Sequence, residues 1–227
     1  MKTIGLLVAV ETDALQAHYT DLEKCPCPKG FELYRRTSGN ATLYILHCGM
    51  GEIYASAGAS YLIHVCGAEC IVNFGVVGGL TADMAKHSLC VIDRLVHYKF
   101  DASEFMPVKI GQVPPYEDIY LQPDASLVEK AVTLCPSLTR VTCASGDKFI
   151  STAEEKSAIH RDFDADICEM EAVGIYLTCA LNDVPCLFLK AVSDGLADGA
   201  DGFWAELTKA ALTCLEVTDG IIAALCD

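Results

Sequence analysis

Residues 172–181 carry no charge, and they directly follow two carboxylates, Glu169 and Glu171. The run is apolar on nearly all sides, which predicts a helix that is buried on most of its surface. Acidic side chains at the start of a helix commonly offset the positive end of the helix dipole. A carboxylate in that place can also accept two hydrogen bonds from neighbouring hydroxyl groups, such as those of a ribose. The spacing by itself leaves both interpretations open.

Strand-like and helix-like segments alternate along the rest of the chain. We expect strands at 3–10, 31–37, 41–48, 69–74, 89–98, 139–144 and 184–192, and helices at 13–24, 53–66, 127–134, 152–161 and 203–225. The strand at 69–74 is expected to end in a glycine-rich turn at 75–79. This alternation predicts one α/β domain over residues 1–227, with a twisted, mostly parallel or mixed central sheet flanked by helices.

Residues 99–123 show little apolar periodicity and contain several prolines, which predicts a long loop. Loops of this length are usually functional or mobile. This one carries Phe100, Phe105, Met106 and Tyr116, and a monomer would leave that apolar area in water. We therefore expect a homodimer.

Charge and hydropathy exclude several classes of partner. The net charge is −15 with a sequence pI near 4.6, so the surface repels nucleic-acid backbones and anionic lipid and accepts a neutral or cationic small ligand more easily. No apolar run reaches the roughly 18 residues of a spanning helix. The apolar residues 1–10 are followed at once by Glu11 and Asp13, which favours a buried first strand over a signal peptide. A cytoplasmic protein is expected.

The thirteen cysteines are scattered singly and odd in number, as is typical of small apolar core residues in a chain without a signal peptide. Cys25 and Cys27 form the one close pair. A metal site would need further ligands, and nothing near this pair has the required spacing. We expect a surface loop at 25–30 and no metal.

Polar or flexible residues follow most of the predicted strands. They are Glu11 and Asp13, the glycine-rich stretches 49–51 and 75–79, residues 145–150, the pair Glu169 and Glu171, and Ser193-Asp194. Ligands of open α/β sheets bind beyond the carboxyl ends of the strands. Each stretch alone has an ordinary explanation as a cap, connector or turn. Their occurrence at successive strand ends predicts that they meet at one edge of the sheet.

Taken together, these stretches resemble the nucleoside phosphorylase/hydrolase superfamily, and within it the 5′-methylthioadenosine/S-adenosylhomocysteine nucleosidases. The resemblance runs over nearly the whole chain. Its most specific motifs are Ser145-Gly146-Asp147-x-Phe149-Ile150, Glu169-Met170-Glu171-Ala172 and Ala191-Val192-Ser193-Asp194, supported by Asn73-x-Gly75-x-x-Gly78-Gly79 and Gly111-Gln112-Val113-Pro114.

The resemblance implies hydrolysis of the N-ribosidic bond of an adenine nucleoside, as in methionine salvage, without a cofactor or a metal. It implies that Asp194 protonates the purine at N7, that Glu171 holds the ribose hydroxyls and that Asp13 polarises the attacking water. Phe149 would stack on the base while the backbone of Ile150 reads its edge. Ser193 would orient Asp194, and the substrate would also be bordered by Glu169, Met170, Met50, Val77 and Gly78. The relatives are homodimers in which a loop of one chain borders the other chain's pocket.

An acid for the leaving base and stabilisation of a cationic sugar are what cleavage of a glycosidic bond requires, so these residue types suit the reaction. The chain also departs from the family pattern. Asp13 stands where the relatives have a longer glutamate, and Lys190 stands where they usually have an arginine. We expect the strand end to compensate for the shorter acid, with Glu11 as the alternative water-activating residue.

Phosphorylases of the superfamily use phosphate in place of water, with an arginine and a hydroxyl at the positions of Asn73 and Val76. Their absence favours water, although Arg35 and Arg36 could bind phosphate from elsewhere or from a partner chain. A hydrolase of another nucleoside, such as futalosine, and a non-catalytic nucleoside-binding relative stay as alternatives. The presence of Asp194 and Glu171 favours an enzyme.

Overall fold

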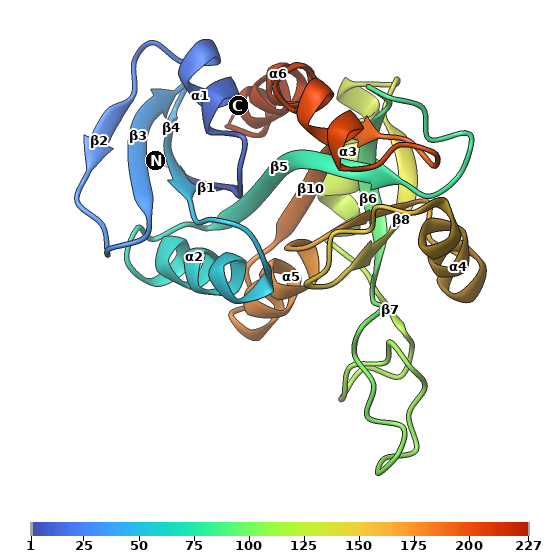
Figure 1. The fold of residues 1–227 in the computed structure, drawn as a ribbon. Helices are drawn as coiled ribbons and strands as arrows, with labels where there is room; N and C mark the ends of the chain where they lie inside the picture. Colours follow the sequence, from blue (N-terminus) through green and yellow to red (C-terminus); the bar gives the residue numbers. More distant parts are fainter. Residues whose placement is uncertain (1, 227) are drawn as a thin grey trace.

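The computed structural model describes residues 2–226 and has the strands and helices in the order that the sequence predicts, with three short strands added (Figure 1). The strands are β1 (Lys2–Val8), β2 (Glu23–Cys25), β3 (Glu32–Ser38), β4 (Ala41–His47), β5 (Cys70–Gly79), β6 (Leu89–His97), β7 (Tyr120–Leu121), β8 (Thr139–Ser145), β9 (Ile167–Glu169) and β10 (Cys186–Asp194). The helices are α1 (Thr12–His18), α2 (Glu52–His64), α3 (Ala125–Leu134), α4 (Ala153–Phe163), α5 (Ala172–Leu181) and α6 (Ala200–Cys226).

The strands form one mixed sheet in the order β10-β6-β8-β9-β5-β1-β4-β3-β2, with β7 paired to β6. Strand β10 also pairs with β5, so the sheet closes on itself through β5, β10, β6, β8 and β9. Parallel pairs join β5 to β1 and to β10, whereas β9 pairs antiparallel with β5 and parallel with β8, and β3 and β4 form an antiparallel hairpin. The predicted mixed sheet flanked by helices is confirmed.

Two layers of helices cover the sheet. Helices α1, α3 and α6 pack against one face around Leu15, Val128 and Leu215. Helices α2 and α5 pack against the other face around Leu62 and Ile175 (Figure 1). The uncharged run 172–181 is α5, as predicted, and it is buried because one side contacts the sheet and another contacts α2.

Two sequence predictions of local structure were wrong. The helix expected over 13–24 ends at His18, and residues 23–25 instead pair as the edge strand β2 with β3. The glycine-rich turn expected at 75–79 is the buried end of β5. A side chain at Gly79 would lie 2.7 Å from the carbonyl oxygen of Met84, so glycine here allows close packing of the extended chain rather than a turn.

The long segment between β6 and β7 extends away from the sheet as a loop, in agreement with the sequence prediction (Figure 1). Phe105 is 80% exposed, and Met106 and Ile110 are exposed as well. Among residues 2–226, no helix combines the length and apolar character that crossing a membrane requires.

Candidate active site

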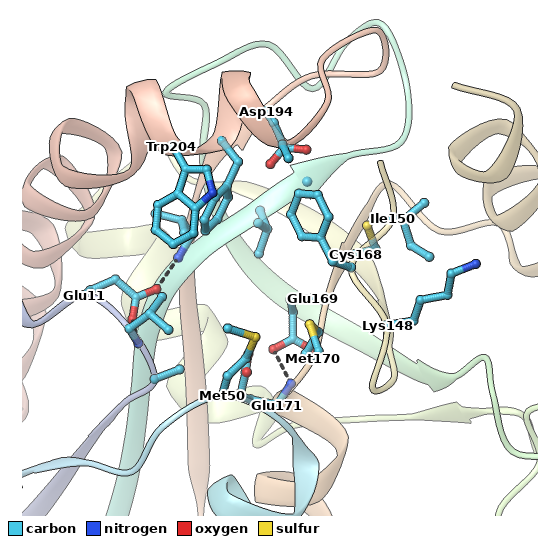
Figure 2. A pocket seen from close by; sticks show the side chains of 18 residues that line it. Glu11, Met50, Lys148, Ile150, Cys168, Glu169, Met170, Glu171, Asp194 and Trp204 are labelled. Carbon is cyan, nitrogen blue, oxygen red and sulfur yellow. Dashed lines mark hydrogen bonds between the residues drawn. The ribbon is translucent and has the colours of Figure 1, made fainter. Parts of the chain in front are cut away.

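One cavity lies where the carboxyl ends of β1, β5 and β10 meet the segments that follow β4, β8 and β9 (Figure 2). The start of α6 borders it from a further side. The lining residues are Ala9, Val10, Glu11, Met50, Val76, Val77, Gly78, Lys148, Phe149, Ile150, Cys168, Glu169, Met170, Glu171, Asp194, Ala200, Phe203 and Trp204. The predicted convergence of strand ends on one site is therefore present in the structure.

Glu169 and Glu171 have different environments, although both are buried beside the first turn of α5. Both carboxylate oxygens of Glu169 accept the backbone N–H of Ala172, at 3.1 and 2.9 Å, and Oε2 also accepts from Glu171 N and from Lys190 Nζ. Glu169 thus caps the positive end of α5 and has little capacity left for a ligand.

Glu171 keeps a free oxygen for a ligand. Its Oε1 accepts the backbone N–H of Gly51 at 2.8 Å, while Oε2 accepts no hydrogen bond from any residue in the described range 2–226. Burial, followed by the charge of Glu169, raises the pKa of Glu171 to about 8. A ribose diol could donate to this side chain, which is the place that the resemblance implies for it.

Asp194 ends β10 opposite Gly78 of β5, at an irregularity of the strand that follows Val192. Its side chain is almost completely buried. Oδ1 accepts the hydroxyl of Ser193 at 2.9 Å and Oδ2 accepts the ammonium of Lys156 at 2.6 Å. Ser193 does not line the cavity but lies behind Asp194, so it contacts the acid in the way that the sequence predicted.

The placement of Asp13 in the site is a sequence prediction that the structure corrects. Asp13 is exposed in the first turn of α1 and does not line the cavity, whereas Glu11 does. The argument that residues 11 and 13 share one side assumed an extended chain, but α1 begins at Thr12 and turns Asp13 away. Glu11 Oε1 accepts the N–H of Val76 at 2.9 Å and Oε2 accepts that of Val10 at 2.9 Å. The alternative that the sequence left open, Glu11, occupies the site.

Two glycines of β5 allow the acids to approach the strand. A side chain at Gly75 would lie 2.8 Å from Glu11 Oε1, and one at Gly78 would lie 3.1 Å from Asp194 Oδ2. Any larger residue at position 75 would displace the carboxylate of Glu11. The glycine-rich stretch therefore shapes the site, although it does not form the turn that the sequence predicted.

Lys190 is almost fully buried, and its Nζ donates to Glu169 Oε2 at 3.3 Å. Burial opposes its charged form, but the neighbouring carboxylates of Glu169 and Glu171 outweigh this effect and raise its pKa above the ordinary value. The lysine thus supplies a positive charge at the position where the resemblance implies an arginine, and it partly offsets the acidic lining.

Aromatic residues from the segment after β8 and from α6 form part of the cavity wall. Phe149 is partly exposed and lines the cavity. Its ring contacts that of Phe203 edge-to-face, with the ring centroids 5.5 Å apart. The ring of Phe203 also contacts that of Trp204 edge-to-face, at a centroid distance of 5.1 Å. Ile150 lies beside them, and Met50, Met170, Val77 and Gly78 line the cavity as predicted. The sequence analysis missed Phe203 and Trp204, for which the adjacent aromatic pair after a turn-rich segment was the available signal.

Asn73 and Val76 stand at the positions that bind phosphate in phosphorylases, and neither side chain suits a phosphate group. Asn73 is buried, does not line the cavity and donates to the carbonyl of Leu7 at 3.0 Å. Val76 lines the cavity with an isopropyl group. Arg35 and Arg36 pair with acids on β2 and α6 and in the segment between α1 and β2, away from the cavity. These positions therefore offer phosphate neither an arginine fork nor a hydroxyl.

Comparison with known proteins gives a consistent result. Residues 3–226 match the family model of the Phosphorylase superfamily. The chain is 30% identical over 187 residues to the aminodeoxyfutalosine nucleosidase of Campylobacter jejuni, covering 81% of this chain and 79% of that protein. It is 28% identical over 198 residues to the 5′-methylthioadenosine/S-adenosylhomocysteine nucleosidase of Haemophilus ducreyi, covering 84% of each.

A solved structure has the same fold over almost the entire chain. The 5′-methylthioadenosine/S-adenosylhomocysteine nucleosidase of Helicobacter pylori, complexed with an aminopyrrolopyrimidine-substituted pyrrolidinol, superposes with a TM-score of 0.91 at 25% identity. The match covers 98% of each chain.

Proposed function

This chain belongs to the Phosphorylase superfamily, and we propose that it hydrolyses the N-ribosidic bond of an adenine nucleoside of the 5′-methylthioadenosine or S-adenosylhomocysteine type. The observation that carries the proposal is the distribution of acids in one cavity. Asp194 lies at one end, and Glu11 and Glu171 lie at the other. A nucleoside bound along the cavity would place its base at the first end and its sugar at the second.

The chemistry follows from this placement. Asp194 donates its proton to N7, and the bond between N9 and C1′ breaks with its electron pair going to the purine, which leaves as neutral adenine. A water molecule held by Glu11 adds to the cationic C1′ and gives its proton to the Glu11 carboxylate. Glu171 accepts the ribose hydroxyls and favours the positive charge on the sugar. The products are adenine and the 5-substituted ribose.

The 5′ end of the substrate would lie near Met50 and Met170, which border both the main cavity and an adjoining shallow hollow. Asp147 is the charged residue of that hollow among those described. A neutral or cationic 5′ substituent therefore fits better than an anionic one. Aminodeoxyfutalosine is the second candidate substrate, because the Campylobacter relative at 30% identity is named for it.

The test is chromatography of reactions with 5′-methylthioadenosine, S-adenosylhomocysteine and aminodeoxyfutalosine, each with and without phosphate. We expect adenine to be released without phosphate and fastest from the first two substrates. Strict dependence on phosphate, with a ribose 1-phosphate product, would refute the hydrolase. Preference for aminodeoxyfutalosine would move the assignment to the second candidate.

We also propose that the protein is a homodimer. The apolar side chains of Phe105, Met106 and Ile110 on the long loop, and of Ile53 and Tyr54 on α2 beside the hollow, are exposed in the single chain. A second copy covering them would also close the 5′ end of the cavity. Light scattering at micromolar concentration tests this, and a mass of 24.4 kDa would contradict it.

A further inference from the structure

Lys156 of α4 is 0% exposed, which is unusual for a lysine. Its Nζ donates to Asp194 Oδ2 at 2.6 Å, to the carbonyl of Gly195 at 2.6 Å and to the carbonyl of Asp198 at 3.3 Å. An ammonium has three N–H donors, and these contacts give each of them an acceptor. The group is therefore held as a cation beside Asp194.

Burying a charge is costly unless it is paired and fully hydrogen-bonded, so this lysine needs a reason to be there. Lys156 does not line the cavity and does not reach the substrate directly. It contacts the reaction through Asp194 alone, whose other oxygen is held by Ser193. Each partner donates to one oxygen, and together they restrain the orientation of the carboxyl group.

We propose that Lys156 is a positioning residue that aims Asp194 at the purine and stabilises the carboxylate that proton transfer leaves behind. This inference rests on the proposed function. In the transfer, the O–H bond of Asp194 breaks, the proton goes to N7 and the electron pair stays on the carboxylate. Lys156 keeps all three of its protons throughout. Negative charge thus develops on Asp194 next to an ammonium that is already in place, and the ion pair seen in the structure forms as the proton leaves.

A purely structural role is the competing explanation, because Lys156 also ties down the turn at 195–198 that leads into α6. The two explanations differ in what the loss of the ammonium does. A positioning role affects only leaving groups that need a proton. A structural role affects every substrate that the cavity accepts.

The experiment compares Lys156→Met with the wild type on two substrates. One is 5′-methylthioadenosine, and the other is the 4-nitrophenyl glycoside of 5-methylthioribose, which releases 4-nitrophenolate, a leaving group that needs no proton. We expect kcat to fall by about 10- to 100-fold on the first, in the range of a mispositioned acid, with KM changed by less than about threefold. On the second, kcat should fall by less than about threefold.

Lys86→Met is the matched control. Lys86 pairs with Asp198 at 3.2 Å from the outer side of the same turn, so the substitution removes a lysine from that turn without touching Asp194. We expect wild-type rates on both substrates. An equal loss in Lys86→Met and Lys156→Met would overturn the positioning role and assign the effect to the turn.

A double variant keeps the proposal testable if Lys156→Met does not fold. Asp194→Asn with Lys156→Met leaves neither member of the pair charged, so no unpaired charge is buried. Because Lys156 acts through Asp194, the double variant should be no slower than Asp194→Asn alone. Multiplied losses, or equal losses on both substrates, would overturn the role of Lys156. A wild type that releases no adenine would instead overturn the proposed function.

Discussion

Replacing Glu171 by glutamine should change the pH dependence of stability as well as the activity. Burial and the charge of Glu169 raise the pKa of Glu171 from 4.5 to about 8. The folded protein therefore binds this proton more tightly than the unfolded chain does. Stability that is present below about pH 4.5 is lost as the pH rises towards 8, because in that range the unfolded chain releases this proton while the folded state keeps it.

The magnitude follows from the two pKa values. Their separation is about 3.5 pH units, which at about 1.4 kcal/mol per unit corresponds to about 5 kcal/mol. Because Glu171 interacts strongly with Glu169 and Lys190, we expect roughly half of this to appear. Glu171→Gln keeps an oxygen that accepts from Gly51 N and carries no titrating proton. Relative to the wild type, it should gain about 2–3 kcal/mol between pH 5 and pH 8.

Urea denaturation at several pH values between 5 and 8 measures this difference. Glu216→Gln, which changes an exposed carboxylate on α6, is the control and should follow the wild type. Glu171→Gln should also lose about 10- to 1,000-fold in kcat/KM, because an amide in place of the carboxylate cannot accept both ribose hydroxyls. Parallel stability curves for Glu171→Gln and the wild type would refute the reasoning, since Glu171 would then ionise as freely in the folded state as in the unfolded chain.

Three further predictions concern the other acids. Asp194→Asn should lower kcat by roughly 10²–10⁴-fold and, because it leaves the Lys156 ammonium without its counterion, should cost about 3–5 kcal/mol of stability in thermal or urea unfolding. Glu11→Gln should remove most of the turnover while Asp13→Asn keeps it, and steady-state kinetics showing the reverse would return the water-activating role to Asp13. Gly75→Ala should slow turnover by about 10- to 100-fold by pushing Glu11 aside, with KM nearly unchanged.

Most of the framework could be predicted because it depends on local patterns. The uncharged run 172–181 predicts a buried helix from its own composition, without reference to the rest of the chain. Two strand-like segments around a turn likewise predict the β3–β4 hairpin. The closure of the sheet could not be predicted in this way. It depends on pairs such as β5 with β9 and β10 with β6, which join segments far apart in the chain.

Lys156 shows a second limit of sequence analysis. It follows Glu154 and Glu155 in a helix with several other charges, a pattern that favours a solvated face. Its burial depends on where α4 lies relative to the end of β10, and no property of α4 alone reports that position. The prediction for Asp13 failed for a local reason instead. The start of α1 at Thr12 decides which of the two nearby acids, Glu11 or Asp13, lies in the site.

The two carboxylates before α5 show what the structure adds. Their spacing was compatible both with caps of a helix dipole and with acceptors for a ribose diol. Hydrogen bonding separates the two roles, because Glu169 accepts four hydrogen bonds from the protein while Glu171 accepts one, from Gly51 N. A carboxylate has about four lone-pair positions, and one whose positions are all filled by the protein stabilises the fold. A buried carboxylate with unfilled positions can bind a ligand, but its burial costs stability. Glu169 therefore caps the helix, and we propose that Glu171 binds the substrate. The pH dependence of the stability of Glu171→Gln, compared with the wild type, measures the free energy that burying the Glu171 carboxylate costs.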